Sequence, residues 1–440
     1  MTAPSWPDRG PQLAVSFSGG GFRASLAGLG MTRALADLGL LGNVRFTSSV
    51  SGGSWANALL ALNWDDLKER NFETEAVDQL LVEPFVKRIT TTSLSRRMTL
   101  RLWKVIGPRT RTDLLADAFD DWFGHGRTLG DLSADARFIF NATNLTTGRR
   151  FSFDQQHLGE RGADSLPSEK MRVADALAAS AALPGALSAQ RLPRSVARPP
   201  RPSRPLLVDG AVYDNLGIEP LRDLDTHPLM VVLDAGAPLH RLNRDLGIID
   251  TLRRSSAVGM NQLTAVRERW FVASLRAWEH WADQNPDQHR SYMADQAHSD
   301  AAIASWRLRQ ANAETKPGET PPPMPPAGAH WGVIFRLDTS MDAKPSHAAY
   351  HESRHTRYED DPQAPEVPPW RDGTFSAAAF RAHTANVPMS AGRFEDYICR
   401  DLIYRGWWLT RETIRTFHPE VLATIPAWSE WYAPAITKTG

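Results

Sequence analysis

Short apolar runs alternate with helical patterns over the first half of the chain. We predict buried strands at residues 13–18, 44–50, 137–143, 205–208 and 229–234. Between these runs, apolar residues recur at helical spacing, most clearly after the first strand. This alternation is typical of an α/β layer structure with a largely parallel sheet, which we expect over residues 13–236.

Two parts of the chain depart from this alternation, one segment within the first half and the whole region after residue 236. Residues 64–134 interrupt the first half with helical material and are expected to form an insertion over the sheet. Residues 246–281 predict one or two long helices, and residues 315–328 are proline-rich and predict a loop. A strand-like run begins at residue 330, followed late in the chain by helical patterns over 393–404 and 410–417. We therefore expect 237–440 to be a mostly helical C-terminal region that packs on or covers the core.

Composition excludes several classes of protein. The 440 residues carry 50 basic and 50 acidic side chains, so there is no overall positive charge for nucleic acid. The single cysteine, Cys399, excludes an internal disulfide framework, and a cytoplasmic protein is expected. No stretch has the roughly 18 uninterrupted apolar residues of a membrane span, so any membrane contact should be peripheral.

Three consecutive glycines, Gly19, Gly20 and Gly21, follow the first predicted strand in the stretch SFSGGGFRAS. Backbone amides without side chains, at the start of a helix, form an anion site. Neither the phosphate-loop pattern nor the dinucleotide pattern is met cleanly. From this stretch alone, the anion is either a phosphate or the oxyanion of an acyl-transfer intermediate.

A candidate nucleophile, Ser51, ends the second predicted strand in the stretch FTSSVSGGSW. A serine on a sharp strand-to-helix turn between small residues is the pattern of a nucleophile elbow, and Gly52 and Gly53 let the turn close. Ser49 stands where that pattern has its first glycine. The structural alternative is that Ser51 only caps the following helix.

A candidate base, Asp209, ends the strand-like run in LLVDGAVYDNLG. Ligands of open α/β sheets bind outside the carboxyl ends of the strands, so Asp209 is expected beside Ser51 and the glycines. Asp209 and Gly210 could instead form an ordinary turn. Asn215 either bonds to the loop that carries Asp209 or caps its turn.

In this order and spacing, the three motifs resemble the patatin-like phospholipase family. The resemblance covers residues 13–236 and includes the segments 141–154 and 173–187. It implies a three-layer α/β/α fold and a lipid acyl hydrolase that cleaves carboxylic esters. No calcium-binding loop is visible in the sequence, so we expect activity without a metal or cofactor. The resemblance also implies a Ser51–Asp209 dyad without a catalytic histidine, and an oxyanion hole at Gly19, Gly20 and Gly21. Arg23 then either supports the glycine loop or meets a lipid phosphate.

Several alternatives stay open within this interpretation. The same site could transfer its acyl group to an alcohol, or the protein could bind lipid without turnover as a regulatory protein, with a partner or ligand that the sequence does not identify. A triad in the order Ser, Asp, His is formally available through His227 or His240.

A zinc-protease signature, H-E-x-x-H, occurs at His351–His355. Its surroundings are polar, whereas helices that bind zinc in this way are buried, so we expect a solvated surface segment. Adventitious metal binding by His347, His351 and His355 is the second interpretation, and no metal site is predicted.

Residues 86–112 carry eight basic side chains and no acidic one, interleaved with apolar residues. This mixture suits a segment that contacts an anionic membrane. An ordinary helix with a solvated basic face is the competing interpretation.

Overall fold

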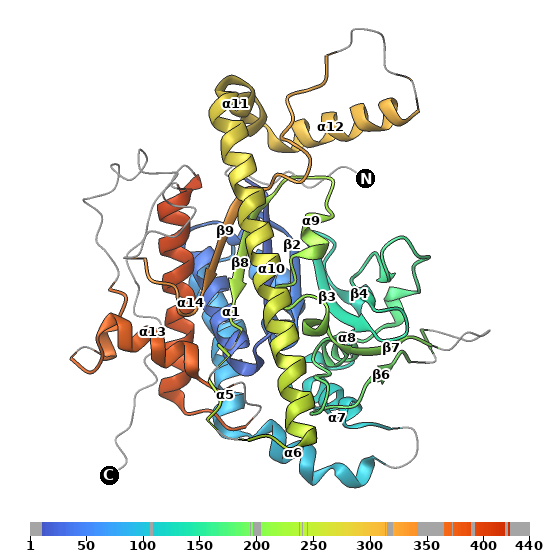
Figure 1. Ribbon diagram of the computed structural model, residues 1–440, viewed down its shortest axis with the longest axis vertical. Helices are drawn as coiled ribbons and strands as arrows, with labels where there is room; N and C mark the ends of the chain where they lie inside the picture. Colours follow the sequence, from blue (N-terminus) through green and yellow to red (C-terminus); the bar gives the residue numbers. More distant parts are fainter. Residues whose placement is uncertain are drawn as a thin grey trace.

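The computed structural model describes residues 11–105, 109–193, 195–196, 204–236, 238–239, 241–243, 245–312, 314, 320–341, 365–371, 373–388, 392–418 and 421–422. Its centre is one sheet of nine strands (Figure 1). The strands are β1 (Leu13–Phe17), β2 (Val44–Val50), β3 (Arg137–Asn144), β4 (Arg149–Phe153), β5 (Leu158–Gly159), β6 (Gln190–Arg191), β7 (Leu206–Asp209), β8 (Leu229–Asp234) and β9 (Gly332–Arg336).

Five central strands are mutually parallel, in the order β3-β2-β1-β8-β9. The remaining strands, β4 to β7, form only antiparallel pairs at one side of the sheet. The predicted α/β class with a largely parallel centre is confirmed. The strands β4, β5 and β6 were not predicted.

Helices cover both faces of this sheet (Figure 1). The α-helices are α1 (Gly21–Asp37), α2 (Gly53–Leu62), α3 (Trp64–Glu69), α4 (Thr74–Val77), α5 (Glu83–Thr91), α6 (Leu94–Leu100), α7 (Arg111–Phe119), α8 (Val173–Ser180), α9 (Glu219–Arg222), α10 (Ile248–Gln284), α11 (Pro286–Ala294), α12 (Gln296–Ala311), α13 (Ala377–Asn386) and α14 (Asp396–Phe417).

The alternation of side chains along β8 explains the three layers. Leu229, Val231 and Leu233 join the larger apolar cluster, which includes residues of α1, α2 and α14. Met230 and Val232 point to the other face and join a second cluster with residues of α9 and α10. Because successive side chains of a strand alternate between faces, a fully apolar strand must be covered on both sides.

The region after residue 236 contributes directly to this core. Its strand β9 pairs in parallel with β8, and α14 packs closely on α1. A Cβ at Gly30 would lie 2.0 Å from the carbonyl oxygen of Ile403, so this helix contact requires glycine. The two helical patterns predicted near the end of the chain form this single helix, α14.

The predicted insertion, residues 64–134, is helical and includes α3 to α7. Its helix α6 lies at the lower end of α10 in Figure 1. Within the described part of the chain, no helix is both long enough and apolar enough to cross a bilayer.

Candidate active site

A cavity of about 730 Å³ lies at the carboxyl ends of the parallel strands. The glycine loop follows β1, Ser51 follows β2, and Asp209 ends β7, and all of them line this one cavity. The structure thus brings together the three motifs that the sequence analysis singled out.

Ser51 occupies the turn between β2 and α2 with a φ of 51°, in the left-handed region. For a residue with a Cβ, this conformation costs about 1–2 kcal/mol. The Ser51 amide donates to the carbonyl and hydroxyl oxygens of Ser180, at 3.2 and 3.0 Å. The turn is therefore strained and anchored, as a nucleophile elbow requires.

The two glycines after Ser51 are needed for space. A Cβ at Gly52 would lie 2.1 Å from the carbonyl oxygen of Gly21, and one at Gly53 would lie 2.4 Å from that of Phe17. Both distances are far below van der Waals contact. These glycines therefore let the serine turn and the glycine loop touch through their backbones.

Asp209 reaches Ser51 from the opposite direction to the one we expected. The strand β7, which carries Asp209, is antiparallel to β3, whereas we expected β7 to be another parallel strand. β4 occupies one side of β3, so β2 and β7 share the other side. Val50 pairs with Asn141 and Asp209 with the next residue, Ala142, so the ends of β2 and β7 meet head-on.

Asp209 is fully buried, and one of its oxygens accepts the Ala211 amide at 2.9 Å. Its second oxygen, Oδ2, has no hydrogen-bond partner in the described chain. Burial raises the pKa of Asp209 to about 6, against the lowering effects of the Ala211 amide and the Ser51 hydroxyl. The Ser51 hydroxyl is therefore near enough to Asp209 to lower the pKa of that carboxyl, although the two groups do not form a hydrogen bond. Such contacts are often long in enzymes without substrate.

The three glycines of the loop have different roles. The Gly19 amide donates to the carbonyl oxygen of Asn215 at 3.0 Å, so it is not available to a ligand, and our expectation that Gly19 is a donor is corrected. Gly20 has a φ of 154°, and a Cβ there would lie 2.4 Å from the carbonyl oxygen of Ala235. Among the described residues, the amides of Gly20 and Gly21 meet no acceptor. They are the donors left at the start of α1.

Arg23 supports the loop and is not available to a phosphate. Its side chain is buried, and its guanidinium donates to the carbonyl oxygens of Ala235, Ala385 and Val387. Burial lowers the pKa of Arg23 to about 10, and the nearby charge of Asp234 partly offsets this. Arg23 therefore ties the start of α1 to β8 and to the end of α13.

Asn215 and Gly210 shape the same corner. The carbonyl of Asn215 holds Gly19, and a Cβ at Gly19 would lie 2.3 Å from the Asn215 Oδ1 atom. Asn215 therefore contacts the glycine loop, a role that neither of our two expectations included. A Cβ at Gly210 would lie 2.4 Å from the carbonyl oxygen of Asn141, so the turn after Asp209 also needs glycine.

Histidine and metal chemistry find no support in the described residues. His227 lies before the amino end of β8, away from the cavity, and its Nδ1 pairs with Asp300 at 3.0 Å. No histidine lines the cavity where the structure describes the chain, and the described residues contain no cluster that could hold a metal ion. His240, His347 and the His351–His355 motif lie outside the described residues.

Two other groups of residues at the site were not predicted from the sequence. The carbonyl of Ala182 accepts the Asp209 amide at 3.0 Å, so residues 180–182 hold both ends of the candidate dyad. The family-like segment 173–187 was the available signal. The apolar wall of the cavity could not be read from sequence, because it gathers Phe22, Trp55, Leu94, Met98, Leu102, Leu115, Leu183, Leu187, Ala257 and Met260 from distant segments.

Comparison with known proteins agrees with these motifs. Residues 15–222 match the family model described as Patatin-like phospholipase, so the resemblance is confirmed for this part of the chain. Over 49 residues, the chain is 49% identical to the mouse (Mus musculus) cytosolic phospholipase A2 gamma, covering 11% of this chain and 8% of that protein.

Solved structures show only distant similarity. Human GIVD cytosolic phospholipase A2 has a TM-score of 0.45 at 14% identity, over 93% of this chain and 60% of that one. VipD from Legionella pneumophila has a TM-score of 0.29 at 13% identity, over 78% and 65% of the two chains. The chain thus spans 60% of the human protein, and its match covers 8% of the mouse protein.

Proposed function

We propose that this chain, whose residues 15–222 form a patatin-like phospholipase domain, is a lipid acyl hydrolase that acts through Ser51 and Asp209. The observation that carries the proposal is the head-on meeting of β2 and β7 at one cavity. It sets a strained serine against a buried carboxylate that has an unpartnered oxygen.

In the proposed reaction, Asp209 accepts the Ser51 proton while the Ser51 oxygen attacks the ester carbonyl. The amides of Gly20 and Gly21 hold the negative oxygen of the tetrahedral intermediate. The intermediate collapses to an acyl-enzyme, and the leaving alcohol takes the proton from Asp209. Water then attacks the acyl-enzyme, gives its proton to Asp209 and releases the fatty acid as the proton returns to Ser51.

The electrostatics of Asp209 suit a base that works near neutral pH. A carboxyl with a pKa of about 6 is ionised at pH 7, yet is more basic than an ordinary aspartate. Because the ionised form is required, we expect the rate on a soluble ester to fall as the pH drops below about 6. At lower pH the fall should approach tenfold per pH unit.

The cavity suits a substrate with a hydrocarbon chain and a polar group. One wall consists of apolar side chains, including Trp55, Met98 and Leu115, and is proposed to hold the acyl chain. Asp234, Glu268 and Arg336 line the cavity at the β8–β9 side and are proposed to face the leaving group.

A fluorophosphonate probe and a panel of lipid esters test the proposal directly. Ser51 should form the covalent adduct, and Ser51→Ala and Asp209→Asn should lower hydrolysis by about 1,000-fold or more while the circular dichroism spectrum is retained. Ser95→Ala is the matched control, because Ser95 lines the same cavity but is not next to Asp209. It should keep both labelling and activity.

The remaining alternatives have separate outcomes in this experiment. A Ser51 that does not react with the probe would favour an inert lipid-binding protein. Adding an alcohol acceptor and finding acyl transfer instead of free fatty acid would favour an acyltransferase. Loss of activity in His240→Ala alone would overturn the dyad.

A further inference from the structure

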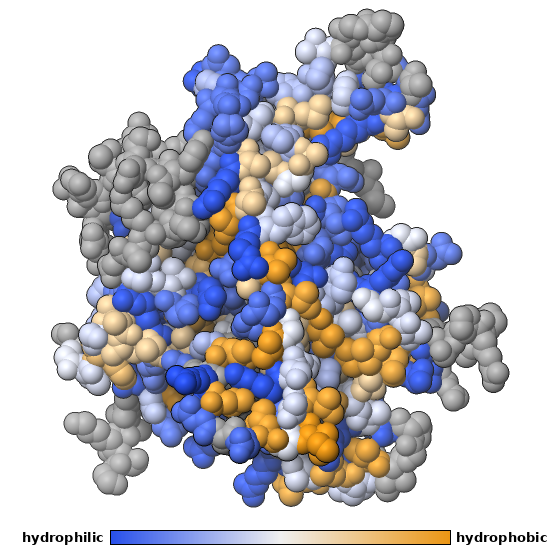
Figure 2. Space-filling model, viewed as in Figure 1, coloured by the Kyte–Doolittle hydropathy of each residue, from blue (hydrophilic) through white to orange (hydrophobic). Residues whose placement is uncertain are grey.

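Exposed apolar side chains gather around the mouth of the cavity. They come from α6 and the 3-10 helix Leu102–Lys104 on one side, and from Leu239 and the first turns of α10 on the other. We call this set the rim patch: Leu100 (66% exposed), Leu102 (37%), Trp103 (68%), Leu239 (37%), Ile248 (83%), Ile249 (66%) and Leu252 (66%). Figure 2 shows apolar residues over the lower part of this face, where Figure 1 places α6 and the start of α10.

The rim patch is continuous with the cavity. Leu102 and Leu239 belong to both, because each lines the cavity and is also exposed. An exposed apolar surface of this extent marks a site of association with a protein or a membrane. A hydrocarbon chain that enters the cavity would pass this patch.

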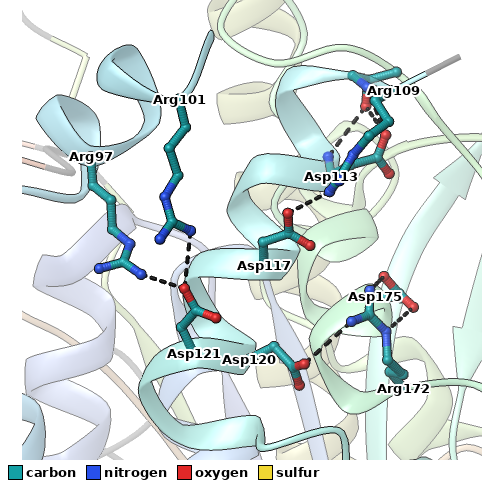
Figure 3. Close-up of polar contacts among 10 residues, drawn as sticks. Arg97, Arg101, Arg109, Asp113, Asp117, Asp120, Asp121, Arg172 and Asp175 are labelled. Atoms are coloured by element: carbon teal, nitrogen blue, oxygen red, sulfur yellow. Dashed lines mark hydrogen bonds and ion pairs between the residues drawn. The ribbon is translucent and has the colours of Figure 1, made fainter. Parts of the chain in front are cut away.

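The charges around the patch are more balanced than the sequence suggested. Arg97 and Arg101 both pair with Asp121, and Arg109 pairs with Asp117, and both of these carboxylates lie outside the basic stretch 86–112 (Figure 3). These ion pairs reduce the long-range field of the basic segment.

Three exposed cations at the rim keep their charge available. Arg96, Arg111 and Arg241 form no ion pair with the described residues. A few separate guanidinium groups around an apolar patch complement the phosphates of lipid head groups, whether the whole lipid is neutral or anionic.

We propose that the rim patch docks on a phospholipid surface, mainly by inserting its apolar side chains, so that a lipid can enter the cavity from the membrane. The inference rests on the proposed function and deepens it by naming the surface that meets the substrate. Because insertion of apolar side chains supplies most of the contact, and Arg97, Arg101 and Arg109 are paired with carboxylates, neutral vesicles should bind and anionic ones should bind only a few-fold better.

Sedimentation of full-length Ser51→Ala protein with vesicles tests docking without any turnover. Phosphatidylcholine vesicles should bind the protein, and adding phosphatidylglycerol should raise binding only a few-fold. The double variant Leu100→Ser/Ile249→Ser, in the same background, should bind at least ten times more weakly. Leu308→Ser is the matched control, since Leu308 is 64% exposed on α12, at the opposite end of the molecule in Figure 1.

The outcomes separate docking from catalysis. With active protein, the double variant should hydrolyse a soluble short-chain ester at the parent rate and vesicle lipid at least ten times more slowly. Equal vesicle binding by the double variant and the control would overturn the proposal. Burial of the rim patch between two copies of the chain would also overturn the proposal. Light scattering would then show a dimer, and the double variant would be a monomer. Absence of any ester hydrolysis would count against the proposed function and leave the vesicle measurement to decide docking.

Discussion

Two regions border the same cavity, the strand ends that carry Ser51 and Asp209 and the helical rim formed by α6 and the start of α10. At the strand ends, backbones touch so closely that Gly20, Gly52 and Gly53 cannot carry a side chain. At the rim, large apolar side chains such as Ile248 are mostly exposed.

The two regions therefore differ in how they affect the free energy of folding. The strand ends hold a left-handed serine and a buried carboxylate, both of which destabilise the fold. The apolar side chains at the rim are exposed to water in both the folded and the unfolded chain, so their exposure changes the folding free energy little. The same exposure leaves a surface that favours association. Variants should therefore change activity and stability at the strand ends, and only surface binding at the rim.

The largest expected effect comes from adding one methyl group at the strand ends. Gly52→Ala would push a Cβ against the backbone of Gly21, so the serine turn and the glycine loop must separate. We expect the rate on a soluble ester to fall at least about 100-fold, as when an oxyanion donor is displaced. Gly259→Ala on α10 is the control, because a Cβ there meets nothing within 4 Å. Equal hydrolysis rates in Gly52→Ala and Gly259→Ala would contradict the prediction that the strand ends tolerate no added side chain.

An intermediate effect is expected on stability from Asp209→Asn. The pKa of Asp209 rises from its ordinary 3.8 to about 6 on folding, so the folded protein binds more protons between these values. Stability from this group is therefore lost as the pH rises through about 6, and the ionised carboxylate destabilises the protein at pH 8. Removing the charge should stabilise the protein by about 2–3 kcal/mol at pH 8 and by little near pH 4.

Thermal or urea unfolding at several pH values measures this difference. Ser51→Ala retains Asp209 and removes the lowering effect of the Ser51 hydroxyl on its pKa, so this variant should show a pH dependence at least as large as that of the parent protein. A stability difference between Asp209→Asn and the parent that is the same at pH 4 and pH 8 would show that the carboxylate is not held at a raised pKa.

The smallest expected effect concerns the strained serine. Ser51→Gly relieves the left-handed conformation, whereas Ser51→Ala keeps a Cβ in it. Relief of this strain stabilises Ser51→Gly, whereas the greater conformational freedom of glycine in the unfolded chain offsets part of the gain. The free energy of unfolding of Ser51→Gly should therefore exceed that of Ser51→Ala by about 0.5–1 kcal/mol. Leu100→Ser at the rim should leave unfolding almost unchanged. A Ser51→Gly protein less stable than Ser51→Ala would mean that the turn is not strained.

The parts of the site that depend on local backbone conformation could be predicted from the sequence. The strands β2 and β8 begin and end where the apolar runs predicted, because alternating or continuous apolar residues encode a buried strand directly. The glycine loop and the serine turn were also recognisable, since a turn that needs small residues must carry them at fixed positions.

The contacts between distant segments could not be predicted from the sequence and are seen only in the folded protein. The direction of β7 depends on its pairing with β3, and the partners of Arg23 lie more than 200 residues away. Part of the charge of residues 86–112 is offset by Asp117 and Asp121 of the following segment, and the long helix α10 forms a wall of the cavity. Local periodicity carries no information on these contacts, because each depends on which faces become neighbours after the sheet has formed.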